Sequence, residues 1–205
     1  MSRDENKRYR SNHMKYLIFS LLFVANLFAL SQNQIENYMD KNINKVVQIL
    51  QNAKENNISK EVVSKEIFQI FDPVFDYNLM ARLSLGSRVW RSLSETQRAK
   101  FTKTFTKKLK ASYKSKLDMY NGQKITVNGI QKIKSNRIHL LSEIKDKKQK
   151  YDIIYKFYRA KNDQWYIYDV TILGVSIIQT YRSQFSDELK KISFDELLKK
   201  LDKQS

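Results

Sequence analysis

The hydrophobic pattern of this chain changes its period at Asn121-Gly122, and that change limits the folds open to it. Before this point, from residue 35 on, apolar residues recur every three or four positions, which is typical of amphipathic helices. After it, apolar and polar residues alternate in runs that predict four strands: Lys124 to Lys134, Arg137 to Asp146, Tyr151 to Ala160 and Trp165 to Gly174. From Val175 the helical period returns.

The turns between the four runs are short and polar, which is typical of hairpins, so we expect an antiparallel four-stranded meander. Helices before and after a meander indicate an α+β fold, with helices packed against one face of a curved sheet. A chain of 205 residues is long enough for one such domain. We expect residues 32–120 to be mainly helical, 121–174 to form the sheet, and 175–205 to form C-terminal helices.

Several residues mark the expected helix boundaries. Pro73 ends or kinks the second helix, and Asp72 is placed to cap the third. Gly86 is placed to end that third helix in a left-handed turn. Two capping boxes, Ser94 with Gln97 and Ser193 with Glu196, predict the starts of a long amphipathic helix and of a short last helix.

The first 31 residues have the layout of a secretory signal peptide. Basic residues precede an apolar run from Tyr16 to Leu30, which is too short to cross a bilayer easily. Ala29 and Ser31 form an acceptable small-x-small cleavage site, with Gln32 as the first mature residue. We therefore expect export to the periplasm, with an uncleaved inner-membrane anchor as the alternative.

The composition excludes much of enzyme chemistry. The chain has no Cys, so disulfides, thiol nucleophiles and cysteine-ligated metals are ruled out. His139 is the one histidine after the leader, and it lies among apolar residues in an expected strand, which favours a structural imidazole over a catalytic base. We expect no catalytic residues and no metal site, although an exported enzyme remains an alternative.

Two blocks of residues carry a family resemblance. The first is Met80-Ala81-Arg82, Leu85-Gly86, Trp90-Arg91, Leu93, Gln97 and Phe101; the second is Trp165, Tyr168-Asp169-Val170, Gly174-Val175-Ser176, Tyr181-Arg182 and Gln184-Phe185. In order and spacing they resemble the MlaC, or toluene-tolerance, family over nearly the whole mature chain. The sequence differs at Leu173, where the family often has an acidic residue, and in its net charge of +17.

The resemblance implies a fold and a function. The fold would be an NTF2-like or cystatin-like sheet with an N-terminal helical subdomain and a deep apolar pocket. The function would be that of a periplasmic phospholipid carrier between an outer-membrane lipoprotein–porin complex and an inner-membrane ABC transporter, which maintains outer-membrane lipid asymmetry. Such a carrier needs no chemical step and no cofactor other than its phospholipid cargo, and we expect a monomer.

A phospholipid pocket must be lined by large apolar side chains, and several segments offer them. The alternative for each residue is an ordinary place in the core. The candidates are Phe71, Phe75, Leu79, Met80, Phe101, Phe105, Ile153, Tyr155, Phe157, Val170, Ile172, Val175 and Ile178.

Charged residues beside the family motifs give a second set of candidates. Arg82, Arg91 and Arg182 each neighbour apolar motif residues, and Asp169 is a candidate partner for one of them. We expect a structural ion pair, with contact to a headgroup phosphate as the alternative. Trp90 and Trp165 are expected to be buried anchors between helices and sheet.

The expected helix from Glu95 to Asp118 is strongly basic, with eight Lys and Arg against those two acids. It is either a solvated face or a surface that docks on anionic lipid or acidic partners. A basic docking protein without lipid cargo is therefore a further alternative. We expect no nucleic-acid partner, because an exported domain meets little nucleic acid and because the basic residues interleave with helical core positions and not with exposed aromatic residues on strands.

Overall fold

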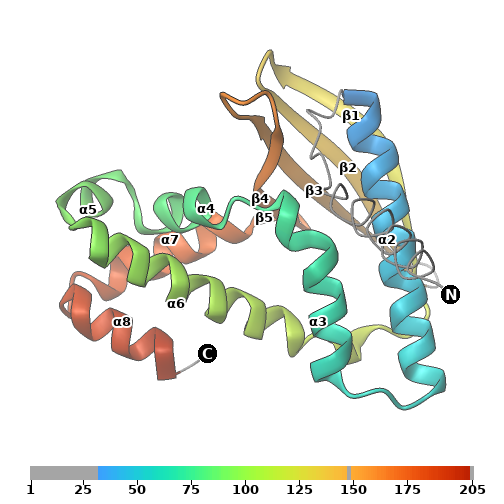
Figure 1. Cartoon of the computed structure of the whole chain (residues 1–205), viewed down its shortest axis with the longest axis horizontal. Coiled ribbons are helices and arrows are strands. Elements are labelled where there is room, and N and C mark those ends of the chain that lie inside the picture. The colour runs from blue at the N-terminus through green and yellow to red at the C-terminus, as the bar shows by residue number, and fades with distance from the viewer. Residues whose placement is uncertain (1–31, 147–148, 204–205) are drawn as a thin grey trace, which may run out of the picture.

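The computed structural model describes residues 32–146 and 149–203 and has the predicted α+β architecture, with an antiparallel sheet and helices (Figure 1). The leader and cleavage site predicted for residues 1–31 lie outside the described residues. Within the described part of the chain, no helix combines the length and the apolar character that a membrane span requires.

The elements follow the predicted order. The helices are α2 (Gln32–Glu55), α3 (Lys60–Phe71), α4 (Tyr77–Leu85), α5 (Ser87–Ser92), α6 (Glu95–Lys114), α7 (Ile177–Glu188) and α8 (Phe194–Lys203), with 3-10 turns η1 (Asp72–Val74) and η2 (Leu117–Met119). The strands are β1 (Lys124–Lys134), β2 (Arg137–Asp146), β3 (Gln149–Arg159), β4 (Trp165–Ile172) and β5 (Val175–Ser176).

The sheet is the predicted meander with one strand more than expected. Its order is β1-β2-β3-β4-β5, and each neighbouring pair is antiparallel. The expectation of four strands ending at Gly174 is wrong, because β5 folds back onto β4. Leu173 and Gly174 both have positive φ, at 53° and 77°, as the two central residues of a tight hairpin turn require.

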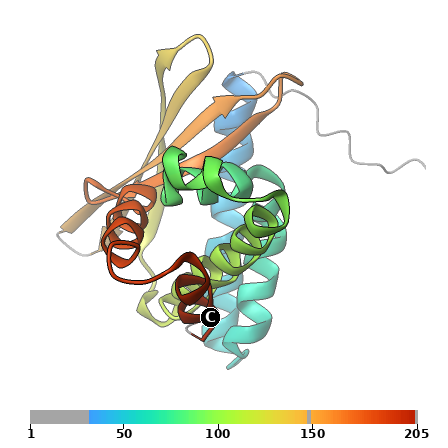
Figure 2. The ribbon, with the colours of Figure 1, turned by 90° about the vertical axis from the view of Figure 1, so that its left-hand side faces the viewer.

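One apolar core lies between the sheet and α2. Ile138, Phe157 and Ile167 are cross-strand neighbours on β2, β3 and β4, and all three are buried. Ile35 and Met39 of α2 join this core, as does Trp165. We call it the sheet core; Figures 1 and 2 show α2 lying along this face of the sheet.

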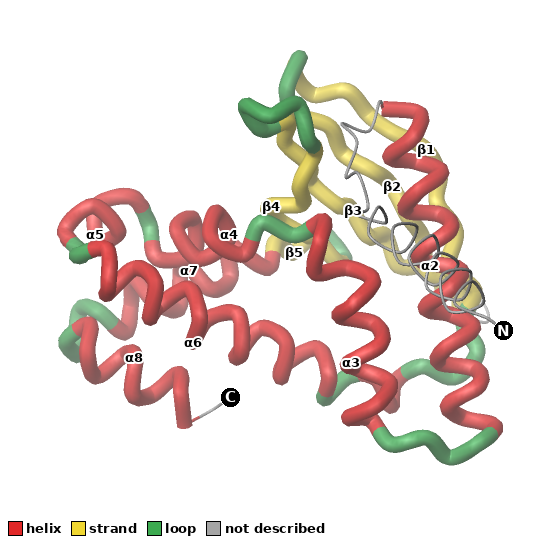
Figure 3. Tube along the Cα trace, viewed as in Figure 1, coloured by secondary structure: helices red, strands yellow, loops and turns green. Residues whose placement is uncertain are grey.

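A second apolar core, the helical core, joins α4, α5, α6, α7 and α8. Its centre is aromatic: the Phe101 and Phe185 rings meet edge to face at 5.7 Å, and the Phe105 and Tyr181 rings at 5.2 Å. Trp90 is buried here as expected, but it packs among helices, so its predicted role as an anchor between helices and sheet is wrong. Figure 3 shows these helices gathered to one side of the molecule, away from α2.

The structure confirms both predicted capping boxes, but one predicted helix cap is wrong. Ser94 and Gln97 exchange hydrogen bonds, as do Ser193 and Glu196. Asp72 does not cap the third helix, because Pro73 first sets a 3-10 turn and the helix begins only at Tyr77. The Asp76 side chain is the cap instead.

Gly86 ends α4, as predicted, but in an extended conformation and not in the predicted left-handed turn. It leads directly into the short helix α5, which the hydrophobic pattern does not predict. Its backbone has φ 86° and ψ 148°, a region that other residues rarely occupy. A Cβ atom at this position would meet only Arg182 Nε, at 3.8 Å. The glycine is therefore required by backbone conformation and not by crowding.

We expect Gly86→Ala to lower the free energy of unfolding by about 1–3 kcal/mol, because alanine is strained in this conformation. Chemical denaturation of both proteins measures the difference. Ser87→Ala, on an exposed neighbour, is the control and should change stability by less than about 0.5 kcal/mol. Equal stability of Gly86→Ala and the wild type would show that the turn relaxes freely.

Candidate functional site

The two cores meet along a seam whose side chains are only partly buried. Phe75, before α4, and Ile177, at the start of α7, pack against both cores. Phe71 contacts Phe75 edge to face at 6.3 Å, and Phe75 stacks on Tyr77 at 5.7 Å. Large apolar side chains that stay partly accessible between two packed layers are typical of ligand pockets.

The structure divides the predicted pocket residues among these regions. Phe71, Phe75, Tyr155 and Ile172 all pack against the sheet core, and all four are half-buried. Leu79 is half-buried on α4, and Val175 is 60% exposed on β5. The remaining candidates are fully packed, three in the sheet core and four in the helical core: Ile153, Phe157, Val170, Met80, Phe101, Phe105 and Ile178.

Tyr155 shows how little water reaches the seam. Its side chain keeps some accessible surface, yet desolvation raises the pKa of Tyr155 to about 12. In the helical core, on α6, desolvation likewise raises the pKa of Tyr113, with Tyr181 and Asp169 adding to the shift. Both phenols therefore stay neutral, and the seam favours apolar or uncharged groups.

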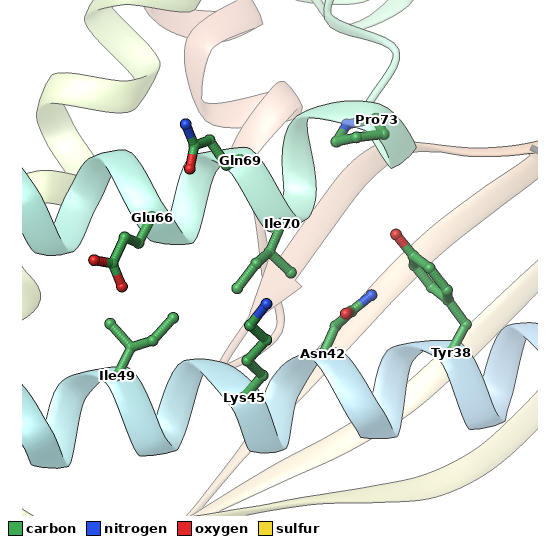
Figure 4. A pocket seen from close by; sticks show the side chains of 8 residues that line it. All are labelled: Tyr38, Asn42, Lys45, Ile49, Glu66, Gln69, Ile70 and Pro73. Atoms are coloured by element: carbon green, nitrogen blue, oxygen red, sulfur yellow. The ribbon is translucent and has the colours of Figure 1, made fainter. Parts of the chain in front are cut away.

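A groove of about 470 Å³ lies between α2 and α3. Figure 4 shows side chains from the two helices pointing toward one another across it. We call it the α2–α3 groove; it is lined by Tyr38, Asn42, Lys45, Ile49, Glu66, Gln69, Ile70 and Pro73. Tyr38 also packs against the sheet core, so the groove borders the apolar interior.

A second hollow, of about 650 Å³, lies at the other end of the same helix pair. Its lining is Leu50, Ala53, Lys54, Asn57, Ile58, Ser59, Lys60, Val63, Leu117, Tyr120 and Asn121, and we call it the foot hollow. The Tyr120 hydroxyl is buried and has no hydrogen-bond partner among the described residues. Both volumes lie within the ~300–1,000 Å³ of ligand pockets.

Sequence reasoning missed the residues that line these two hollows, since none of them is a predicted pocket residue. One signal for them existed in α3. Its apolar residues occupy more than one helix face, although only Val63 and Ser64 are buried. A helix with more apolar surface than its packing covers indicates a nearby binding surface.

Asp169 holds the two cores together through a buried charge. Its carboxylate accepts hydrogen bonds from Lys156 Nζ at 2.9 Å, Ser176 Oγ at 2.7 Å and the Ile178 amide at 3.1 Å. Lys156, and not an arginine, is therefore its ion-pair partner. The three candidate arginines are exposed on helices: Arg82, Arg91 and Arg182.

The basic helix α6 uses several of its lysines within the molecule. Lys110 pairs with Asp72 at 2.6 Å and lies 5.1 Å from the centre of the Phe68 ring. Lys114 pairs with Glu61 of α3, and Lys107 with Asp202 of α8. These contacts tie α6 to its neighbours, so less of its charge is open for docking than the sequence indicates.

His139 lies half-buried on the sheet face opposite α2, and desolvation together with nearby Lys156 lowers its pKa. The described part of the chain contains no group of three or more metal-ligating side chains. The histidine is therefore part of the packing around Lys156 and Asp169.

Because the pKa of His139 is lower in the folded chain, acid should destabilise the fold through this residue. The unfolded chain takes up a proton near pH ~6.5 that the folded chain resists, so stability falls as the pH drops below that value. Unfolding free energies measured at about pH 7.5 and about pH 5.5 should differ less for His139→Gln than for the wild type. An equal difference in both proteins would remove His139 as the cause.

The sequence model of the family described as "MlaC protein" matches residues 40–203. In structure the chain is similar to the phospholipid-binding protein from Ralstonia solanacearum, solved in complex with a phospholipid. The TM-score is 0.65 at 19% identity, over 80% of this chain and 95% of that chain. No curated protein matches. Because the family model spans most of the sequence, this chain belongs to the MlaC family, which confirms the family that its two motif blocks predict.

Proposed function

We propose that this protein is a periplasmic phospholipid carrier that holds acyl chains in its apolar seam and performs no chemical step. The observation that carries the proposal is the bound phospholipid in the Ralstonia solanacearum protein, a structure with the same fold. Membership of the MlaC family supports the same function. The carrier would move lipid between an outer-membrane lipoprotein–porin complex and an inner-membrane ABC transporter, as a monomer and without a cofactor.

The energetics of transport explain why such a carrier is needed. The two chains of a phospholipid contain on the order of 30 methylenes, and at ~0.8 kcal/mol each their exposure to water costs about 25 kcal/mol. A carrier must offer the acyl chains an apolar environment comparable to the interior of the bilayer. It must not bind them much more strongly than the bilayer does, because it could then not release its cargo. A partly accessible seam between two packed cores meets both conditions better than a closed interior.

Native mass spectrometry of the purified protein tests the proposal. We expect a bound mass of about 0.7 kDa, the size of a diacyl lipid with some 30 methylenes. Solvent extraction should then release an intact phospholipid. A protein that purifies empty and takes no lipid from vesicles would contradict the carrier function and favour a docking role for the basic surface.

Variants separate the seam from ordinary core. Phe71 is half-buried at the end of α3, so we expect Phe71→Asp to lose most bound lipid while the protein stays folded. Phe105 is 0% exposed in the helical core, and Phe105→Ala should instead cost about 3–5 kcal/mol of stability. Lipid content per protein and thermal unfolding are measured on both.

Ala53→Trp tests the foot hollow as the other possible place for the acyl chains, and we expect it to leave lipid content normal because the chains lie in the seam. Ala53 lines the foot hollow, and the indole would fill space without adding a charge. Normal lipid content in a folded Phe71→Asp variant would place the acyl chains outside the seam. Normal content in Ala53→Trp would exclude the foot hollow.

A further inference from the structure

One row of side chains crosses the sheet on the face turned away from α2. Lys134 of β1 lies opposite Arg137 of β2. Arg137 lies opposite Tyr158 of β3, which lies opposite Tyr166 of β4. The residues next to them along β2, β3 and β4 belong to the sheet core, so the row itself lies on the other face. We call these four residues and Tyr168 the tyrosine row; its three tyrosines are half-buried yet lie outside both cores.

The arginine of the tyrosine row is held by two rings. The Arg137 guanidinium lies 5.1 Å from the centre of the Tyr158 ring and 5.3 Å from that of the Tyr168 ring. It donates to the Asn136 carbonyl and makes no ion pair with a carboxylate in the described part of the chain. The carboxylate near the row, Asp76, caps α4 and accepts a hydrogen bond from the Tyr158 hydroxyl. Because stacking orients the guanidinium, its remaining N–H groups form a planar fork of the kind that binds phosphate.

The basic charge around the tyrosine row exceeds the acidic charge. The turn between β1 and β2 and the turn between β3 and β4 lie at the same end of the sheet (Figure 1), which we call the hairpin end. Within residues 132–137 and 159–164 there are five basic residues and one acid, Asp163, which pairs with Arg159 at 3.8 Å. The basic residues are Lys132, Lys134, Arg137, Arg159 and Lys161. Unlike α6, which uses several of its lysines in internal ion pairs, the hairpin end keeps most of its charge open.

An apolar side chain is exposed among these charges. Ile133 is 43% exposed between Lys132 and Lys134 at the end of β1. Tyrosine rings, basic side chains with apolar stems and an exposed aliphatic group suit the headgroup layer of a bilayer, where one end of a side chain is apolar and the other is wet. The helix α2 begins at the hairpin end too (Figure 1), close after the apolar run from Tyr16 to Leu30 in the sequence. While that run is attached, the hairpin end is the end of the domain nearest a membrane.

We propose that the hairpin end docks on the surface of an anionic bilayer. Arg137 donates to lipid phosphates, the lysines beside it are attracted to anionic headgroups, and Ile133 enters the headgroup layer. Docking of this kind does not need bound cargo, so the inference goes beyond the proposed carrier function and is tested apart from it.

Co-sedimentation with vesicles tests the docking surface. The purified protein is mixed with vesicles of phosphatidylcholine alone, or of equal parts of phosphatidylcholine and phosphatidylglycerol. We expect binding to the mixed vesicles that weakens as the salt concentration rises, and little binding to phosphatidylcholine alone. The double variant Lys134→Gln with Arg137→Gln should weaken binding to the mixed vesicles about thirtyfold, which corresponds to about 1 kcal/mol for each charge.

A matched control removes the same charge from another surface. Lys100→Gln with Lys103→Gln, at exposed positions of α6, should change binding less than about twofold, because α6 lies away from the hairpin end and salt screens its charges over that distance (Figure 1). Ile133→Ser tests the apolar contact and should weaken binding about threefold at every salt concentration, since salt does not screen it. Circular dichroism of each variant shows whether it is folded.

Two results would overturn the docking surface. One is a wild type that does not bind anionic vesicles. The other is an equal loss of binding in the two double variants, which would make the effect one of net charge and not of this surface. Native mass spectrometry of the same variants measures their lipid content, so a variant that keeps its lipid but no longer docks leaves the carrier function standing.

Single-stranded nucleic acid is the competing ligand for the tyrosine row. Basic residues do lie among aromatic residues on strands here, contrary to the expectation from sequence, and such surfaces also stack bases. A single-stranded oligonucleotide is therefore added in place of vesicles. We expect no binding at physiological salt; oligonucleotide binding that Lys134→Gln with Arg137→Gln abolishes, by a protein that does not bind vesicles, would assign the row to nucleic acid.

Discussion

The buried carboxylate of Asp169 ties the helical part of this fold to its sheet. Through three hydrogen bonds it joins β3, β5 and the start of α7, and so fixes the helical core to the sheet. Loss of the lysine would leave the buried carboxylate without its ion-pair partner, which is strongly destabilising. The contact therefore specifies one arrangement of the two cores. The seam between them keeps its shape because this joint is polar and directional.

Two cores in one small domain serve a carrier better than one core. A single close-packed interior has no room for a large apolar ligand, since protein interiors are packed as densely as organic crystals. Here each core is complete by itself, with Phe101, Phe105 and Phe185 in one and Ile138, Leu140 and Ile167 in the other. The surfaces between the two cores can therefore contact a ligand while each core stays packed.

The sequence predicted local structure well and the site less well, for physical reasons. Strand bounds follow from alternation and turn residues, which are local, so β1 and β2 match the prediction at both ends. The sequence did not predict the strand β5, because a leucine occupies a left-handed position in the turn between β4 and β5. The partner of Asp169 depends on the register of β3 against β4, which pairs Lys156 with Asp169 across 13 positions of sequence. The hollows depend on how loosely α3 packs, and the local pattern shows only that the apolar residues of α3 occupy more than one helix face.

The attachment of α3 has a consequence for exchange of the cargo. Ion pairs of Glu61 and Asp72 with α6 hold this helix at its two ends, while its own buried residues are few. A helix with so few buried side chains has a lower local stability than the two packed cores. Screening by salt, or by the charged surface of a bilayer, weakens such contacts far more than it weakens apolar packing. For the proposed carrier, α3 would then be the element that the charged surface of a membrane loosens first.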